Sequence, residues 1–255
     1  MTATELLLSV APENLWHWSL VFMRISGMLA ILPAFGDRMI PVRVRLAIAV
    51  AFATIVAPAL PPVDIPTDQR LLLIVILELA TGLFFGLMLR MLVFALQVAG
   101  AIAAQSTSVS QIFGGSAGAD PQPAMTHFLV ISAMALATLL GLHIKITVYI
   151  LTSFRLVPMA VILPAGVVAD LALSEVTRAF GLALSLAAPF VIASLLYNVV
   201  LGFINRAMPQ LMVSFVGAPA LTAGGLLLFF LSAPLILSIW IGAFHDAMLS
   251  PFGAD

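Results

Sequence analysis

Long runs of residues without a single charge occur five times along the chain. They are residues 46–63, 91–119, 121–144, 179–205 and 207–245. About 20 apolar residues cross the ~30 Å hydrocarbon core of a bilayer as one helix. The strands of a membrane barrel alternate apolar and polar side chains over about 10 residues, whereas these runs are apolar on every face. The pattern therefore predicts an all-α integral membrane protein.

Three weaker apolar segments lie between the charge-free runs. Residues 15–35 contain Arg24, residues 71–89 contain Glu78, and residues 156–169 are too few to cross a bilayer squarely. Strong and weak segments together predict six or seven helices.

Some of these helices are expected to be long and kinked. Residues 71–113 show no obvious break, so they predict one helix of about 65 Å at ~1.5 Å per residue, twice the hydrocarbon thickness. Pro189, Pro219 and Pro234 interrupt apolar segments and imply kinks that neighbouring protein must satisfy. Pro209 lacks an N–H group, so residues 206–210 predict a turn that ends one helix and precedes the next.

Composition agrees with a membrane protein and excludes several other classes. Hydrophobic residues make up 63% of the 255 positions and charged residues only 8%, against about 25% charged residues in a soluble domain. Ten basic and eleven acidic residues give a net charge of -1, so there is no basic face for nucleic acid. Without cysteine, the chain has no disulfide, thiolate nucleophile or thiolate metal ligand.

Four charges lie inside apolar segments, where a charge at the bilayer centre costs at least ~2.5 kcal/mol. They are Arg24, Glu78, Arg90 and Lys145. Glu78 and Arg90 are twelve residues apart, which is about 18 Å along one helix, so they cannot pair with each other. We expect all four side chains to face protein, water or an interface.

The residues that usually carry catalysis or bind a cofactor do not form any constellation. The four histidines are scattered, and none has a second histidine or a carboxylate three or four residues later. The glycine-rich segment 114–118 lacks the Lys-Ser/Thr pair of a phosphate-binding loop. We therefore expect no enzyme activity, no metal and no cofactor.

One polar stretch stands out against this apolar background. Six of the seven residues 105–111 have polar uncharged side chains, and a segment rich in Gly, Ala and Pro follows up to residue 123. The candidates for a pore lining or obstruction are Gln105, Ser106, Ser108, Ser110, Gln111, Ile112, Phe113, Gly114 and Gly115. Such side chains are costly against lipid and favourable against water or backbone. The stretch is either part of an aqueous path or an ordinary polar loop at the membrane surface.

An ordered set of short motifs along nearly the whole chain resembles the FliR family, which comprises the flagellar biosynthetic proteins FliR and their counterparts in virulence injectisomes. The set consists of Arg24, Pro33, Phe35-Gly36-Asp37-Arg38-Met39-Ile40-Pro41, Arg45-Leu46, Gln105, Gly141, His143, Ser153-Phe154, Pro158 and Asn205-Arg206-Ala207-Met208-Pro209-Gln210-Leu211. No single motif is specific, but their order and spacing are.

The resemblance implies a subunit of the type III export gate in the bacterial inner membrane, at the flagellar basal body. Such a subunit assembles with FliP and FliQ homologues in a hetero-oligomer, near FlhA and FlhB homologues. The assembly forms a conduit for unfolded export substrates and contacts membrane lipid. Its transport energy comes from other components and from the proton-motive force.

The resemblance also implies an internal division and roles for particular residues. Residues 1–170 would be a FliP-like helical region with a plug loop at about 105–123, and residues 171–255 a FliQ-like helical hairpin. The charged side chains expected to face other subunits are Arg24, Glu78, Arg90, Lys145 and Arg206.

Three rival functions remain open at this point. The chain could serve a virulence injectisome instead of a flagellum. It could be a stand-alone secondary transporter that uses Glu78, Arg90 or Lys145 as relay residues. An intramembrane enzyme is the weakest rival, because the sequence offers no pair of nucleophile and base.

Overall fold

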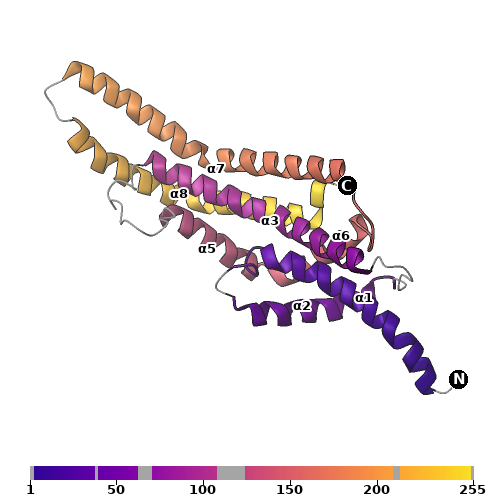
Figure 1. Cartoon of the computed structure of the whole chain (residues 1–255). Coiled ribbons are helices and arrows are strands. Elements are labelled where there is room, and N and C mark those ends of the chain that lie inside the picture. The colour runs from indigo at the N-terminus through magenta and orange to yellow at the C-terminus, as the bar shows by residue number, and fades with distance from the viewer. Residues whose placement is uncertain (1–2, 38–39, 63–70, 108–123, 209–212, 254–255) are drawn as a thin grey trace. The chain divides into compact units, whose positions relative to one another are not determined.

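Seven α-helices and two short 3-10 helices make up the described part of the chain, with no strand there, so the all-α prediction is confirmed (Figure 1). The computed structural model describes all residues except 1–2, 38–39, 63–70, 108–123, 209–212 and 254–255. The helices are α1 (Ala3–Ile31), α2 (Val42–Val56), η1 (Ala57–Ala59), α3 (Leu71–Ser106), α5 (Ala124–Leu139), α6 (Leu142–Leu156), α7 (Ala165–Ala207), α8 (Val213–Leu249) and η2 (Pro251–Gly253).

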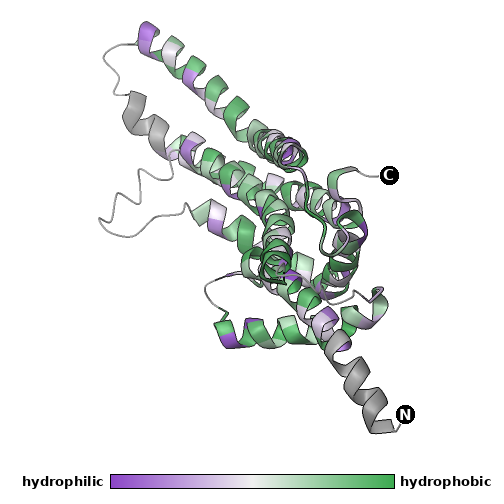
Figure 2. Cartoon of the chain, turned by 45° about the vertical axis from the view of Figure 1, so that its right-hand side comes forward, coloured by the Kyte–Doolittle hydropathy of each residue, from purple (hydrophilic) through white to green (hydrophobic). Residues whose placement is uncertain are grey.

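Several helices are long and apolar enough to cross a membrane. Among the described residues there are four such spans, or five if α5 and α6 form one interrupted span. The four are Val42–Ala59, Leu71–Ser106, Ala165–Ala207 and Pro219–Leu249. In Figure 2 hydrophobic residues predominate along the coloured parts of the helices, with hydrophilic residues among them.

Two helix boundaries differ from the sequence pattern. Helix α3 ends at Ser106 rather than continuing to residue 113, so its 36 residues span about 54 Å. At its end the backbone N–H and the hydroxyl of Thr107 both donate to the Ala103 carbonyl. The charge-free run 121–144 is split at Gly141, whose φ of 79° suits a residue without a Cβ atom.

The end of α7 agrees with the predicted turn. Helix α7 stops at Ala207 and α8 starts at Val213, so one helix ends within residues 206–210, as Pro209 predicts. Pro189 lies inside α7, and Pro219 and Pro234 lie inside α8, which continue through them.

The chain folds into two compact units, each built from segments far apart in sequence. Unit 1 comprises Met1–Met91, Gly141–Glu175 and His245–Asp255, and unit 2 comprises Leu92–Leu140 and Val176–Phe244. Helices α3, α7 and α8 contribute to both units. These units do not coincide with a division at residue 170, which falls inside α7.

Unit 1 is held by a close crossing of α1 and α3. A Cβ atom on Gly82 would overlap the carbonyl oxygen of Arg24, and one on Gly86 would lie 2.6 Å from the carbonyl oxygen of Met28. A Cβ atom on Gly27 would likewise lie 2.5 Å from the carbonyl oxygen of Leu79 on α3. Small residues four apart let the two backbones approach.

Aromatic rings of the same part of α3 attach the C-terminal segment to unit 1. Phe252, with φ of 68°, packs its ring 6.0 Å from that of Phe84 and 5.7 Å from that of Phe85. Tyr149 of α6 is buried beside Phe85 and donates its hydroxyl to the Phe85 carbonyl at 2.9 Å. The 3-10 helix η2 is thereby fixed to α3.

Unit 2 packs parts of α3, α5, α7 and α8 together. Trp240 of α8 is fully buried and donates its indole N–H to the Leu92 carbonyl at 2.8 Å. Phe190 of α7 and Phe229 of α8 have ring centroids 6.3 Å apart, so these two helices lie side by side in this unit. A Cβ atom on Gly225 would overlap the side chain of Thr107, which brings the end of α3 against α8.

The substitution Gly82→Leu should separate α1 from α3, because the obstacle is backbone and cannot rotate away. Overpacking of this kind costs about 1–3 kcal/mol. We expect a lower midpoint of thermal unfolding for the detergent-solubilised chain, measured by size-exclusion chromatography after heating. Gly166→Leu is the matched control, since a Cβ atom there meets nothing within 4 Å. Equal midpoints for both variants would contradict this account.

Candidate functional site

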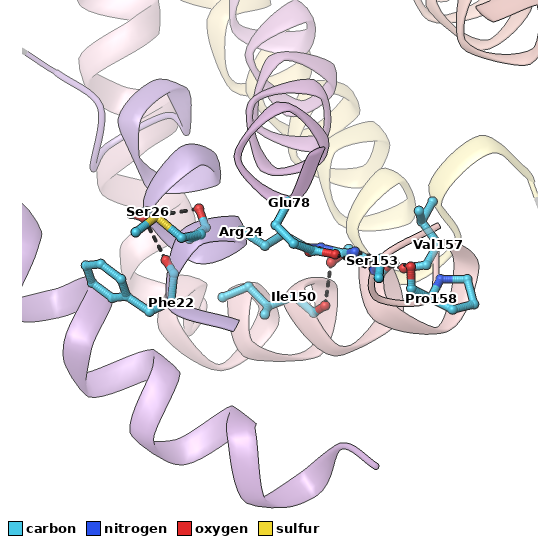
Figure 3. Close-up of polar contacts among 10 residues, drawn as sticks. Phe22, Arg24, Ser26, Glu78, Ile150, Ser153, Val157 and Pro158 are labelled. Atoms are coloured by element: carbon cyan, nitrogen blue, oxygen red, sulfur yellow. Dashed lines mark hydrogen bonds and ion pairs between the residues drawn. The ribbon is translucent and has the colours of Figure 1, made fainter. Parts of the chain in front are cut away.

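A buried ion pair joins α1 to α3 inside unit 1. Arg24 donates from Nε to Oε2 of Glu78 at 2.6 Å, and the two side chains are 1% and 2% exposed. Figure 3 shows the two side chains pointing toward one another from different helices. A charge-assisted bond of this length is of the strong kind.

The rest of the Arg24 guanidinium binds the end of α6 and the loop that follows. Nη1 donates to the carbonyls of Ser153 at 3.2 Å and Val157 at 2.6 Å, and Nη2 donates to that of Pro158 at 3.5 Å. The guanidinium also lies 4.1 Å from the centre of the Phe154 ring. A helix C-terminus leaves carbonyls without donors and favours a nearby cation. Arg24 supplies both the hydrogen-bond donors and the positive charge.

Glu78 completes the network with its second oxygen. Oε1 accepts the backbone N–H of Ala160 at 2.8 Å, and Ala160 has φ of 61°, in the left-handed region. Together Arg24 and Glu78 tie α1, α3 and residues 153–160 into one network, which we call the Arg24–Glu78 clamp. Both carboxylate oxygens and all three guanidinium nitrogens have partners. The clamp therefore holds the backbone of residues 153–160 against α1 and α3.

The clamp changes the picture for the charges inside apolar segments. The resemblance to the FliR family leads us to expect Arg24 and Glu78 to face other subunits, whereas the structure pairs them with each other within the chain and buries both. Arg90 is half-buried and donates to the carbonyl of Ile31 at 3.1 Å. Lys145 is half-buried on α6, and Arg206 is exposed near the end of α7. For Arg90, Lys145 and Arg206, contact with a partner subunit stays a prediction.

The sequence carried a partial signal for the clamp. A charge within an apolar helix needs a partner of opposite sign, and Glu78 is the one acid among the four such charges. Arg90 is on the same helix and too far away, which leaves Arg24 and Lys145 as the cations it could bind. Arg24 and Glu78 are 54 residues apart, and hydropathy does not tell which helices are neighbours. The backbone acceptors Ser153, Val157 and Pro158 carry no signal in their side chains.

The predicted plug residues lie at the end of α3 and beyond it. Gln105 is exposed and Ser106 half-buried at the last turn of α3 in unit 2. Ser108, Ser110, Gln111, Ile112, Phe113, Gly114 and Gly115 lie outside the described residues. Thr107 is 3% exposed and packs on Gly225, so the chain enters the predicted plug segment from a fixed point.

Beside this point is a pocket of about 380 Å³ in unit 2. Hydroxyl-bearing residues on its wall are Ser106, Thr107, Ser194 and Tyr197, among apolar residues of α7 and α8. In the described residues, no three His, Asp or Glu side chains come together in a way that could hold a metal ion.

Removing one member of the Arg24–Glu78 clamp should leave the other as an unpaired buried charge. We expect Arg24→Met to lower the free energy of unfolding by about 3–5 kcal/mol. The double variant Arg24→Met, Glu78→Leu should lose less free energy of unfolding, because no unpaired charge remains. Its remaining loss comes from backbone groups left without a hydrogen-bond partner, at about 1–3 kcal/mol each. Thermal unfolding of the solubilised chain measures both. A single variant as stable as the unaltered chain would show that water reaches the pair.

Comparisons with known proteins cover nearly the whole chain. Residues 15–247 match the model of the bacterial export proteins, family 1. The flagellar biosynthetic protein FliR of Caulobacter vibrioides is 31% identical over 236 residues, covering 90% of this chain and 93% of that protein. FliR of Aquifex aeolicus is 29% identical, covering 89% of each chain, and FliR of Escherichia coli is 26% identical, covering 88% of this chain and 85% of its own. The chain therefore belongs to the bacterial export proteins, family 1, the family of FliR.

Proposed function

We propose that this chain forms, together with FliP and FliQ homologues, the conduit through which unfolded rod, hook and filament subunits leave the cytoplasm. As a FliR-family protein it is a component of the flagellar type III export apparatus, a transport component and not an enzyme. Its place is the inner membrane at the basal body. The observation that carries the proposal is the similarity to FliR proteins along about 90% of the chain.

The length of α7 supports assembly with partner subunits. Its 43 residues span about 65 Å, and even a tilt of about 40° leaves roughly 50 Å along the membrane normal. The hydrocarbon core is only ~30 Å thick. Yet apolar side chains are exposed along the helix, including Leu184 (60%), Leu195 (62%) and Phe203 (70%). Lipid tails cannot cover all of them, so we assign the remainder to other subunits.

We further propose that residues 105–123 form a plug across the closed conduit. A conduit wide enough for a polypeptide would also pass ions, and a hydrophobic constriction can close a pore by dewetting. Ile112 and Phe113 would supply that constriction. The close packing of Thr107 against Gly225 supports this role, because it anchors the chain at the start of the proposed plug. The pore-lining role of Gln105 and Ser106 is part of the same proposal.

The internal division belongs to this proposal as well. Residues 1–170 would act as a FliP-like region and residues 171–255 as a FliQ-like hairpin. Helices α7 and α8, which lie side by side in unit 2, support a hairpin. FlhA and FlhB homologues would lie nearby.

Two rival functions fit less well. The similar proteins from Caulobacter vibrioides, Aquifex aeolicus and Escherichia coli are all flagellar, which favours a flagellum over an injectisome. A secondary transporter would need a relay residue with a free oxygen or nitrogen. Glu78 binds Arg24 and Ala160 with its two oxygens, which favours a structural role.

The assembly is tested by affinity purification of the tagged chain, which measures the amount of copurified FliP and FliQ homologues. The variant Gly181→Phe tests whether another subunit packs against α7. A Cβ atom on Gly181 of α7 meets nothing within 4 Å in this chain. If another subunit packs there, the ring should lower the yield of copurified FliP and FliQ homologues about tenfold, the effect of moderate overpacking. The chain expressed alone should keep its unfolding temperature. Normal yield of the complex would mean that lipid covers this part of α7.

Deletion of residues 111–119 tests the plug. We expect the complex to assemble, because α3 ends at Ser106 and α5 begins at Ala124, outside the deletion. The membrane should then leak ions or small solutes, measured as conductance of the purified complex in planar bilayers and as slower growth. Normal conductance in a fully assembled complex would make the segment an ordinary loop.

A further inference from the structure

The apolar run 156–169, which is too short to cross a bilayer squarely, includes the connection between α6 and α7 in unit 1. We call residues 158–164 of this connection the apolar loop. They contain one turn and otherwise no regular secondary structure. Val161 is 45% exposed and Ile162 is 62% exposed. The conduit and the plug do not account for this exposed apolar surface.

The Arg24–Glu78 clamp holds the apolar loop in one conformation. Arg24 donates to two carbonyls at the base of the loop (Figure 3), and Glu78 accepts the N–H of Ala160 within it. Ala160 has φ of 61°, a conformation that residues with a Cβ atom rarely adopt and that persists only when the surroundings impose it. Such backbone outliers gather at functional sites. The clamp thus fixes the backbone that carries the two exposed side chains.

Lipid is a poor neighbour for the apolar loop. The backbone N–H groups of Val161, Ile162 and Leu163 donate to no other described residue. Irregular backbone with such groups is not found against lipid tails, because no water is there to accept the hydrogen bonds. Segments at the level of the headgroups are typically anchored by Trp, Tyr, Lys or Arg, and residues 156–169 contain none of these. The loop therefore fits neither the hydrocarbon core nor its surface.

We propose that the apolar loop docks against another protein subunit of the export apparatus. That subunit covers Val161 and Ile162 with apolar side chains and offers hydrogen-bond acceptors to the N–H groups of the loop. Residues 156–169 carry no charge, so the covering surface is apolar and not charged. A loop that is fixed before binding loses little conformational freedom on docking, which favours affinity. The inference rests on the proposed assembly with other subunits and gives the Arg24–Glu78 clamp a role in it.

Crosslinking in cells identifies the neighbour of the loop. A photoreactive amino acid replaces Ile162 in the tagged full-length chain, and the adducts in the purified complex are analysed by mass spectrometry. We expect an adduct with another protein subunit. Adducts with phospholipid alone, or no adduct with protein, would overturn the proposal.

The variant Ile162→Ser measures the contribution of the docked side chain. The position is exposed, so the chain expressed alone should keep its unfolding temperature. The yield of copurified subunits should fall about tenfold, the effect of losing one buried isoleucine. Equal yields from Ile162→Ser and the unaltered chain would refute docking and leave the proposed assembly standing. If the unaltered chain copurifies no other subunit, the assembly fails and docking with it.

A matched pair of variants at Ala160 tests the fixed conformation. Ala160→Gly keeps the N–H that binds Glu78 and tolerates a positive φ, so the yield of copurified subunits should stay normal. Ala160→Pro removes that N–H and cannot adopt φ of 61°, so the yield should fall although Ile162 is intact. The unfolding temperature of each variant expressed alone separates loss of docking from loss of folding. Equal yields from the two variants would show that the clamp does not serve docking.

Discussion

The ion pair between Arg24 and Glu78 determines which segments of unit 1 can lie together. Two charges are buried in apolar surroundings, and such a pair is tolerated only with excellent geometry and further hydrogen bonds. The carbonyls of Ser153 and Val157 and the N–H of Ala160 provide those bonds. Gly82 allows the close approach of α1 and α3 that the pair requires. A shift of either helix by one turn would break the pair and create a steric overlap, so electrostatics and packing select the same register.

Many large apolar side chains of the described residues are exposed, and a good number of them lie on α7. Helix α7 is longer than any bilayer can cover, which calls for protein contacts along part of its length. Helix length thus indicates protein neighbours for part of α7, which hydropathy alone does not reveal.

The sequence predicted the fold better than it predicted contacts. Hydropathy was sufficient for an all-α membrane chain and for a long α3, and Pro209 marked the end of α7. Hydropathy placed the end of α3 seven residues too late, because the absence of charge does not by itself mark where a helix ends. Polarity alone drew attention to residues 105–111. It could not pair Arg24 with Glu78, since periodicity reveals the face of a helix and not its neighbour.

The aromatic contact of Phe252 with Phe84 and Phe85 has a consequence for synthesis of the protein. Those two rings leave the ribosome long before Phe252 does, because about 167 residues separate Phe85 from Phe252. At roughly 5–20 residues per second, translation takes about 8–33 s over that distance. Throughout this interval Tyr149 can already cover Phe85, but the place of Phe252 beside Phe84 and Phe85 stays empty. Unit 1 is therefore completed only when translation reaches η2, and a premature stop codon in α8 would leave it without this last aromatic contact.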